Sequence, residues 1–200
     1  MKIMKHVLTF KNYNIADWFS FYRIAAAPLL LSLIWFDFRN IFTWLLFISY
    51  STDAIDGFLA RKLKIVSPRG SQLDSFGDQI TLIVGLIALF YFENVFINQN
   101  LTLILIAFTP YIIQMLIAYF KYGKATAFHT YLAKLSAILQ SIFILTSLFF
   151  APDYNLFYIM IVIGILETVE EVTLIFMYDT WVSDVKGIYM AFKDKRRLKK

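Results

Sequence analysis

The sequence has no cysteine among its 200 residues and few charged residues, at 16%. Without cysteine, neither a disulfide framework nor a thiolate metal site is possible, and redox chemistry gives no indication of the compartment. Hydrophobic residues make up 60% of the chain and aromatic residues 18%. This balance argues against an ordinary soluble domain and predicts an integral membrane protein.

The first residues do not have the pattern of a removable signal peptide. Residues 1–11 are basic and amphipathic, and neither an uninterrupted apolar core nor a small-residue cleavage site precedes the first long apolar run. We expect residues 1–17 to form an amphipathic helix that lies in the membrane interface. The sequence also lacks an internal repeat, and its one low-complexity stretch is the charged C-terminus.

Six apolar segments are each long enough, or nearly so, for the roughly 20 residues that cross a bilayer as a helix. They cover residues 18–36, 41–60, 72–92, 101–120, 132–150 and 156–177. None of the linkers between them is long enough to be a soluble domain. The predicted fold class is therefore all-α, a bundle of six transmembrane helices. We expect one domain, 1–200, with the interfacial segment 1–17, the spans in 18–177 and a basic tail at 178–200.

The basic residues behind the net charge of +5 gather on one side of the predicted spans. They precede the first span and follow the second, fourth and sixth, whereas the opposite loops carry only Arg39 among basic residues. The positive-inside rule therefore predicts that both termini face the cytoplasm. We expect the membrane to be a prokaryotic inner membrane. The basic cluster at 193–200 is expected to lie on anionic lipid headgroups, at about 1 kcal/mol per basic residue, rather than on nucleic acid.

Four aspartates lie close together at the predicted cytoplasmic ends of the second and third spans. They are Asp53, Asp56, Asp74 and Asp78. The first two are three residues apart and the last two are four apart, so each pair shares one face of a helix. A carboxylate among apolar residues is costly unless it is paired, bound to a metal or exposed to water. Two antiparallel helices joined by a short loop can bring all four carboxylates together.

A cluster of carboxylates without histidine or cysteine nearby suits the hard cations Mg²⁺ or Mn²⁺. Four carboxylates can hold two such ions about 3.5–4 Å apart, an arrangement typical of phosphoryl chemistry. Gly57 would let a bulky ligand approach the backbone, and Arg61 could bind a phosphate. An internal ion-pair network with Arg61 is the structural alternative. Four carboxylates beside one arginine leave excess negative charge, which argues against it.

The aspartate motif resembles the signature of the CDP-alcohol phosphotransferase family, D-x-x-D-G-x-x-A-R, eight residues, then G-x-x-x-D-x-x-x-D. The positions that match are Asp53, Asp56, Gly57, Ala60, Arg61, Gly70, Asp74 and Asp78. The motif covers 26 residues, and the six-span layout extends the resemblance to most of the chain.

The resemblance implies transfer of a phosphatidyl group from CDP-diacylglycerol to a small alcohol. The alcohol hydroxyl would attack the β-phosphorus, CMP would leave and a phosphodiester would form. By resemblance, two divalent ions, Mg²⁺ or Mn²⁺, would be held by Asp53, Asp56, Asp74 and Asp78. Asp78 would also accept the proton of the attacking hydroxyl. The residues that would contact the CDP group are Asp53, Gly57, Arg61 and Ser67. The resemblance also suggests a homodimer.

Two further segments resemble the phosphatidylglycerophosphate synthase branch, which makes glycerol 3-phosphate the leading acceptor. Segment 14–23 looks like N-x-P-N-x-x-T-x-x-R. It departs from that pattern at Ala16, Asp17 and Ser20. Segment 132–140 looks like G-K-x-K-T-x-x-Q and keeps Lys134 and Gln140, but lacks the glycine and the second lysine.

These departures leave inositol phosphate, another polyol, serine and phosphatidylglycerol as alternative acceptors. Lys134 is the candidate contact for an acceptor phosphate. Its structural alternative is a helix-end lysine whose ammonium reaches the membrane surface.

Three glutamates of the sixth span, Glu167, Glu170 and Glu171, share one helical face. Glu167 and Glu171 are candidates to bind acceptor hydroxyls. Alternatively, the glutamates form a charge network with Arg23, Lys121 or Lys134.

Two functions other than catalysis are alternatives for this motif, namely transport and scaffolding. A cation or proton transporter would also place carboxylates within the membrane, but we find no repeat, and the aspartates lie near one face. A catalytically silent scaffold would be expected to lack at least one aspartate of the motif, and all four are present.

Overall fold

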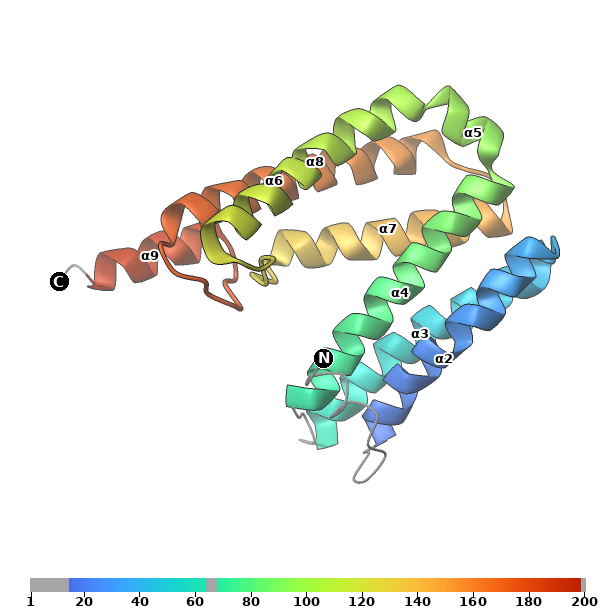
Figure 1. Ribbon diagram of the computed structural model, residues 1–200, viewed down its shortest axis with the longest axis horizontal. Helices are drawn as coiled ribbons and strands as arrows, with labels where there is room; N and C mark the ends of the chain where they lie inside the picture. The colour runs from blue at the N-terminus through green and yellow to red at the C-terminus, as the bar shows by residue number, and fades with distance from the viewer. Residues whose placement is uncertain (1–14, 64–67, 199–200) are drawn as a thin grey trace. The chain divides into compact units, whose positions relative to one another are not determined.

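The structure, a computed structural model, describes the backbone of residues 15–63 and 68–198 and the side chains of 18–52 and 76–193. Within these ranges the chain is built from α-helices (Figure 1). They are α2 (Ile15–Trp35), α3 (Arg39–Leu63), α4 (Pro68–Phe92), α5 (Asn94–Gln99), α6 (Leu101–Tyr122), α7 (Tyr131–Phe149), α8 (Tyr154–Met177) and α9 (Ile188–Leu198). In the described part, β pairing is confined to an isolated bridge between Ala127 and Ser183. The prediction of an all-α chain is confirmed.

Each of the six apolar segments forms a helix, namely α2, α3, α4, α6, α7 and α8. Three stretches of the described chain are long and apolar enough to cross a membrane: Trp18–Trp35, Leu101–Tyr122 and Tyr131–Phe149. A shorter apolar stretch, Phe76–Phe92, lies in α4. The structure thus supports an integral membrane protein with three candidate spans, and the six-span layout stays a prediction.

Two helices were not predicted from the sequence. The short helix α5 forms in a segment read as a linker, and α9 forms in the segment read as a basic tail. The interfacial helix predicted for residues 1–17 falls largely outside the described residues, although α2 already begins at Ile15.

Local capping signals account for several helix boundaries. Helix α4 begins at Pro68, a residue that suits the first position because it has no N–H to satisfy. Helix α6 ends at Tyr122 and is capped by Gly123, whose left-handed backbone (φ 69°) lets its N–H donate to the Tyr119 carbonyl at 2.9 Å. Helix α8 follows Asp153, whose carboxylate accepts a hydrogen bond from the Leu156 N–H at 2.8 Å.

The helices form two compact units, which we describe separately. Unit 1 comprises the described residues up to Asn94 together with Ile144–Ala151. In it, α2 packs against both α3 and α4, and the three helices lie side by side (Figure 1). The buried core of this unit consists of Ala27, Leu30, Ile34, Phe42, Leu46, Val84, Ala88, Ile144 and Leu148. The last two come from the C-terminal end of α7.

Unit 2 comprises Val95–Phe143 and the described residues from Pro152 onward. Here α6 packs against α8, and α8 contacts α9. One core cluster of this unit consists of Ala118, Phe128, Leu174, Ile175, Val185 and Ala191. A separate aromatic cluster joins Phe96, Phe143 and Phe157, with ring centroids 5.0–6.0 Å apart.

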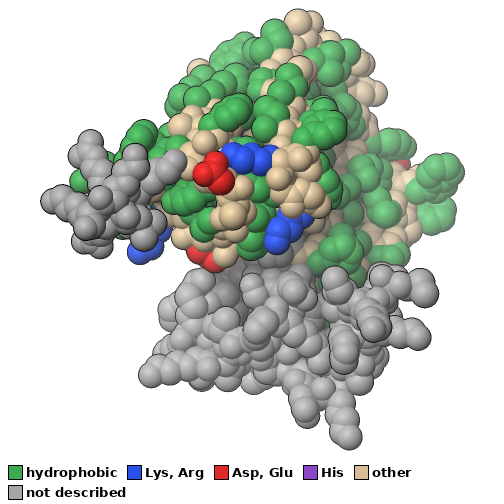
Figure 2. All heavy atoms as spheres, turned by 60° about the vertical axis from the view of Figure 1, so that its left-hand side comes forward, with side chains coloured by type: hydrophobic (Ala, Val, Ile, Leu, Met, Phe, Trp, Pro, Cys, Tyr) green, Lys and Arg blue, Asp and Glu red, His purple; other side chains and the backbone are tan. Residues whose placement is uncertain are grey.

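Many large apolar side chains point outward. Trp35, Phe120 and Phe150 are each more than 80% exposed. Hydrophobic side chains cover most of the coloured surface in Figure 2, and charged side chains are few there. So much exposed apolar surface is unusual for a soluble monomer but suits a hydrocarbon environment. The surface therefore agrees with the membrane character predicted from composition.

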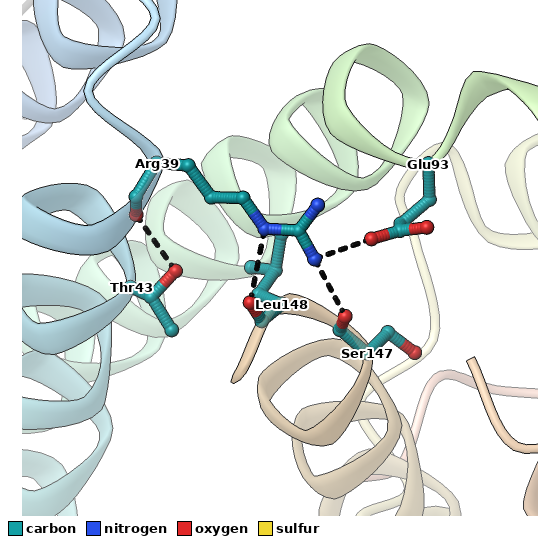
Figure 3. A network of polar contacts seen from close by, with 5 residues as sticks. All are labelled: Arg39, Thr43, Glu93, Ser147 and Leu148. Atoms are coloured by element: carbon teal, nitrogen blue, oxygen red, sulfur yellow. Dashed lines mark hydrogen bonds and ion pairs between the residues drawn. The ribbon is translucent and has the colours of Figure 1, made fainter. Parts of the chain in front are cut away.

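Arg39, the basic residue on the predicted non-cytoplasmic side, ties together three segments of unit 1 (Figure 3). Its guanidinium pairs with Glu93, directly after α4. It also donates to the carbonyls of Ser147 and Leu148, at 3.0 and 3.1 Å, in the last turn of α7. A cation at a helix C-terminus satisfies carbonyls that have no intrahelical partner and interacts favourably with the helix dipole.

We expect Arg39→Met to destabilise unit 1, because Glu93 and the two carbonyls would lose their donor. A loss of about 1–3 kcal/mol is expected, a range between those for single hydrogen bonds and for buried ion pairs. Thermal unfolding in detergent would measure it, with Arg39→Lys giving an intermediate loss. Lys193→Met, at an exposed position of α9, serves as the control. Equal unfolding midpoints for Arg39→Met and the control would contradict the role of Arg39.

Candidate active site

The four aspartates of the motif lie on two packed helices. Asp53 and Asp56 lie in the C-terminal half of α3, and Asp74 and Asp78 lie in the first half of α4. The two helices contact each other, and α4 returns alongside α3 (Figure 1). The predicted helix pair is therefore present. The side chains of Asp53, Asp56 and Asp74 lie outside the described side chains, so their convergence stays a prediction.

Of the residues expected to contact the CDP group, the structure describes at most the backbone. Gly57 and Arg61 lie in the last two turns of α3, on the same helix as the first aspartate pair. The side chain of Arg61 lies outside the described side chains, and Ser67 lies outside the described residues altogether. Their contacts with a CDP group therefore stay predictions.

Asp78 is the aspartate of the motif whose side chain is described. Its Oδ1 forms an ion pair with Nη1 of Arg23, which lies on α2. The Arg23 side chain is only 1% exposed, whereas the Asp78 side chain is 47% exposed. A buried cation thus contacts a carboxylate that is partly open to its surroundings. Such a carboxylate can both be oriented by its partner and be reached by a ligand.

Gly77 of α4 lies beside this ion pair. A Cβ atom at Gly77 would lie 3.5 Å from both Cζ and Nε of Arg23 and 3.4 Å from the Ser20 carbonyl oxygen. A Cβ atom at this position would therefore be in ordinary van der Waals contact with the guanidinium, one residue before Asp78. The Thr81 hydroxyl donates to the Gly77 carbonyl at 2.8 Å, within the same helix.

Sequence reasoning did not find this pairing. It named Arg23 as an alternative partner of the glutamates of the last span, but the structure pairs it with Asp78. Gly77 is not a fixed position of the family signature. The available signal was the presence of an arginine inside an apolar segment, which requires a partner.

The four aspartates of the motif are chemically suited to bind a divalent cation. The four motif positions supply carboxylate oxygens, which Mg²⁺ and Mn²⁺ prefer, and the Asp78 side chain is accessible. Among the described side chains, no group of three or more histidine, aspartate or glutamate residues could hold a metal. Three of the four expected ligands fall outside that search.

Glu171 on α8 takes part in a hydrogen-bond network within unit 2. One of its carboxylate oxygens accepts from Gln114 on α6 at 2.8 Å and from the Thr126 hydroxyl at 2.7 Å. The Gln114 amide also donates to Thr126 at 3.1 Å, and Gln114 is almost fully buried. Glu171 thus joins α8 to α6 and to the loop after α6, which favours a structural role.

Glu170 also has a contact within unit 2. Glu170 accepts a hydrogen bond from the Ile188 N–H, at 3.3 Å, where α9 begins. A carboxylate at a helix N-terminus is favourable because the first N–H groups lack intrahelical partners. Glu167 lies about one turn before Glu170 and Glu171 on α8.

The lysines differ in how their charge is used. Lys121 donates to the Ile175 carbonyl at 2.8 Å and lies 3.9 Å from Asp179. Lys134 lies in the first turn of α7, is exposed, and has its ammonium 6.0 Å from the ring centroid of Tyr131. Both lysines are exposed, but among the described residues the Lys134 ammonium has no hydrogen bond or ion pair, so of the two it is the more available to an anionic ligand.

The comparisons with known proteins agree with the motif. The family model described as CDP-alcohol phosphatidyltransferase matches residues 13–181, which include the whole aspartate motif. A CDP-diacylglycerol–glycerol-3-phosphate 3-phosphatidyltransferase from Wigglesworthia glossinidia brevipalpis is 29% identical over 187 residues. That match covers 90% of this chain and 96% of the relative. No solved structure matches the chain.

We expect Glu171→Ala to destabilise unit 2, because the Thr126 hydroxyl would lose its acceptor and the buried Gln114 amide one of its two acceptors. Leaving a buried donor unsatisfied costs about 1–3 kcal/mol, so the unfolding midpoint in detergent should fall clearly. Glu171→Gln keeps an acceptor oxygen and should cost less. Thr173→Ala, on the same helix, is the control, because its hydroxyl only donates to the Val169 carbonyl. A midpoint for Glu171→Ala equal to that of Thr173→Ala would refute the structural role.

Proposed function

The chain belongs to the CDP-alcohol phosphatidyltransferase family, and we propose that it transfers a phosphatidyl group from CDP-diacylglycerol to glycerol 3-phosphate, releasing CMP. The observation that carries this proposal is the complete aspartate motif on the packed helices α3 and α4. The printed activity of the bacterial relative supports glycerol 3-phosphate as the acceptor. The product would be phosphatidylglycerophosphate.

In the proposed reaction, the acceptor hydroxyl oxygen attacks the phosphorus that carries the diacylglycerol group. The new P–O bond forms as the bond from this phosphorus to the CMP phosphate oxygen breaks. Asp78 accepts the hydroxyl proton as general base, and CMP leaves with the electron pair of the broken bond. The Asp78 carboxylate is suited to this role because it is partly exposed to a ligand and is oriented by a buried arginine.

The family is generally dependent on divalent metal ions. We propose that Asp53, Asp56, Asp74 and Asp78 hold two of them, Mg²⁺ or Mn²⁺. When bound, such ions would supply charge neutralisation at the pyrophosphate. Gly57, Arg61 and Ser67 are proposed to bind the CDP group: the glycine by allowing close approach, the arginine by pairing with a phosphate.

Lys134 is our proposed contact for the acceptor phosphate, because its ammonium is exposed and carries the charge that a phosphate requires. Glu167 and Glu171 are kept as proposed contacts of acceptor hydroxyls. Glu171 is the weaker of the two, since one of its oxygens already accepts two hydrogen bonds.

We also propose six membrane crossings, with both termini and the aspartate motif at the cytoplasmic side of a prokaryotic inner membrane, and a homodimer. The three apolar candidate spans and the one-sided distribution of basic residues support this arrangement. The departures at segments 14–23 and 132–140 keep inositol phosphate, another polyol, serine and phosphatidylglycerol as alternative acceptors.

The proposal predicts that purified protein, incubated with CDP-diacylglycerol and Mn²⁺, forms phosphatidylglycerophosphate and CMP from glycerol 3-phosphate. Mass spectrometry would identify the lipid, and the four alternative acceptors would be tested in parallel. Asp78→Asn should lower CMP release by about 10²–10⁴-fold, the usual contribution of a general base, while CDP-diacylglycerol still binds. If no acceptor gives product, the proposed chemistry is wrong. If another acceptor gives product, only the acceptor assignment changes.

Lys134→Ala is expected to raise the apparent KM for glycerol 3-phosphate by about 10-fold or more, because charge-assisted hydrogen bonds contribute about 1.5–3 kcal/mol. Lys134→Arg keeps the charge and should have a smaller effect. Glycerol, which lacks the phosphate, provides a matched comparison whose KM or residual rate should not respond to the substitution. An unchanged KM for glycerol 3-phosphate would remove Lys134 from the acceptor site.

A further inference from the structure

Arg23 is a buried arginine in α2, a helix apolar enough to cross a membrane. Burial of an unpaired guanidinium is strongly unfavourable, so its presence needs a compensating partner. Asp78 is such a partner, and the proposed function assigns the proton transfer to its carboxylate. The carboxylate that compensates the buried charge of Arg23 thus belongs to the candidate active site.

The surroundings of Arg23 restrict where its guanidinium can lie. It lies beside Gly77 of α4, and Ser20, one turn earlier on α2, is also buried. Further along α2, Ala27 and Leu30 belong to the hydrophobic core of unit 1. The arginine is therefore the fixed member of the pair, and the partly exposed Asp78 is the member whose orientation the contact can determine.

We infer that Arg23 is a positioning residue that holds the Asp78 carboxylate in one orientation toward the attacking hydroxyl. This inference rests on the proposed function, because it requires Asp78 to act on the acceptor. The guanidinium is too deeply buried to contact a substrate itself, so it acts through Asp78. The Nη1 to Oδ1 contact restrains the rotation of the carboxylate about its side-chain bonds.

The first test replaces Arg23 by glutamine and by lysine. Arg23→Gln should lower kcat by about 10²-fold, the effect typical of a misplaced catalytic group, and leave the KM for CDP-diacylglycerol within about threefold. Arg23→Lys retains a cation and should recover part of the rate. A folded Arg23→Gln protein with the kcat of the parent would overturn the inference, as would an equal loss in kcat and in CDP-diacylglycerol binding.

A double substitution separates positioning from a general structural role. If Arg23 acts through Asp78, adding Arg23→Gln to Asp78→Asn should not lower the residual rate further, because coupled residues are not additive. A second drop of about the same factor would show that the two residues act independently and would overturn the inference. Sensitive product detection by mass spectrometry makes the residual rates measurable.

Gly77 offers a matched pair of variants that leave Arg23 in place. Gly77→Ala places its Cβ at an ordinary contact distance from Arg23 and should keep kcat within about threefold of the parent. Gly77→Val adds methyl groups that crowd the guanidinium and should lower kcat by about 10-fold or more. Should the Arg23 variants fail to fold, parental kcat in Gly77→Val would still overturn the inference.

The two proposals fail in different ways. If Asp78→Asn turns over at the parental rate, Asp78 is not the base, and the proposed mechanism and the positioning role both fall. If Asp78→Asn is inactive while Arg23→Gln and Gly77→Val match the parent, only the positioning role falls. Loss of activity in all three, with Gly77→Ala active, supports both.

Discussion

The pairing of a buried arginine with a carboxylate is the interaction on which unit 1 depends. Arg23 can lie within apolar α2 because Asp78 of α4 contacts it. This contact joins α2 to α4 at the level of the aspartate motif. Toward the opposite ends of the helices, Arg39 joins the start of α3 to Glu93 and to the last carbonyls of α7. Ion pairs and hydrogen bonds thus secure both ends of a core that is otherwise apolar.

Unit 2 uses its charged residues in a similar way, but for connections between helices and loops. Glu171 joins α8 to Gln114 and Thr126, and Glu170 accepts from the first N–H of α9. Polar groups inside an apolar protein are costly unless they are satisfied, and here one carboxylate oxygen of each of these two glutamates accepts a hydrogen bond. This reduces the case for the glutamates as acceptor contacts and leaves exposed Lys134 as the clearest candidate for an acceptor phosphate.

Several elements could be predicted because they depend on local sequence. Long apolar runs predicted all six long helices, and the spacing of the aspartates placed them on two neighbouring helices. Helices α5 and α9 were not predicted, because one is only six residues long and the other lies in a strongly charged segment. In both, tertiary contacts stabilise a helix that composition does not indicate: Phe96 of α5 and Ala191 of α9 are buried.

The sequence by itself determined the membrane character, the helical segments and the family to which the chain belongs, because run length, spacing and motif are properties of neighbouring residues. Only the tertiary structure decided which charges meet. Arg23 and Asp78 are 55 residues apart, Arg39 and Glu93 are 54 apart, and Gln114 and Glu171 are 57 apart. Each polar group had several possible partners in the sequence. Helix packing selected one arrangement, because buried polar groups must be satisfied where the helices come into contact.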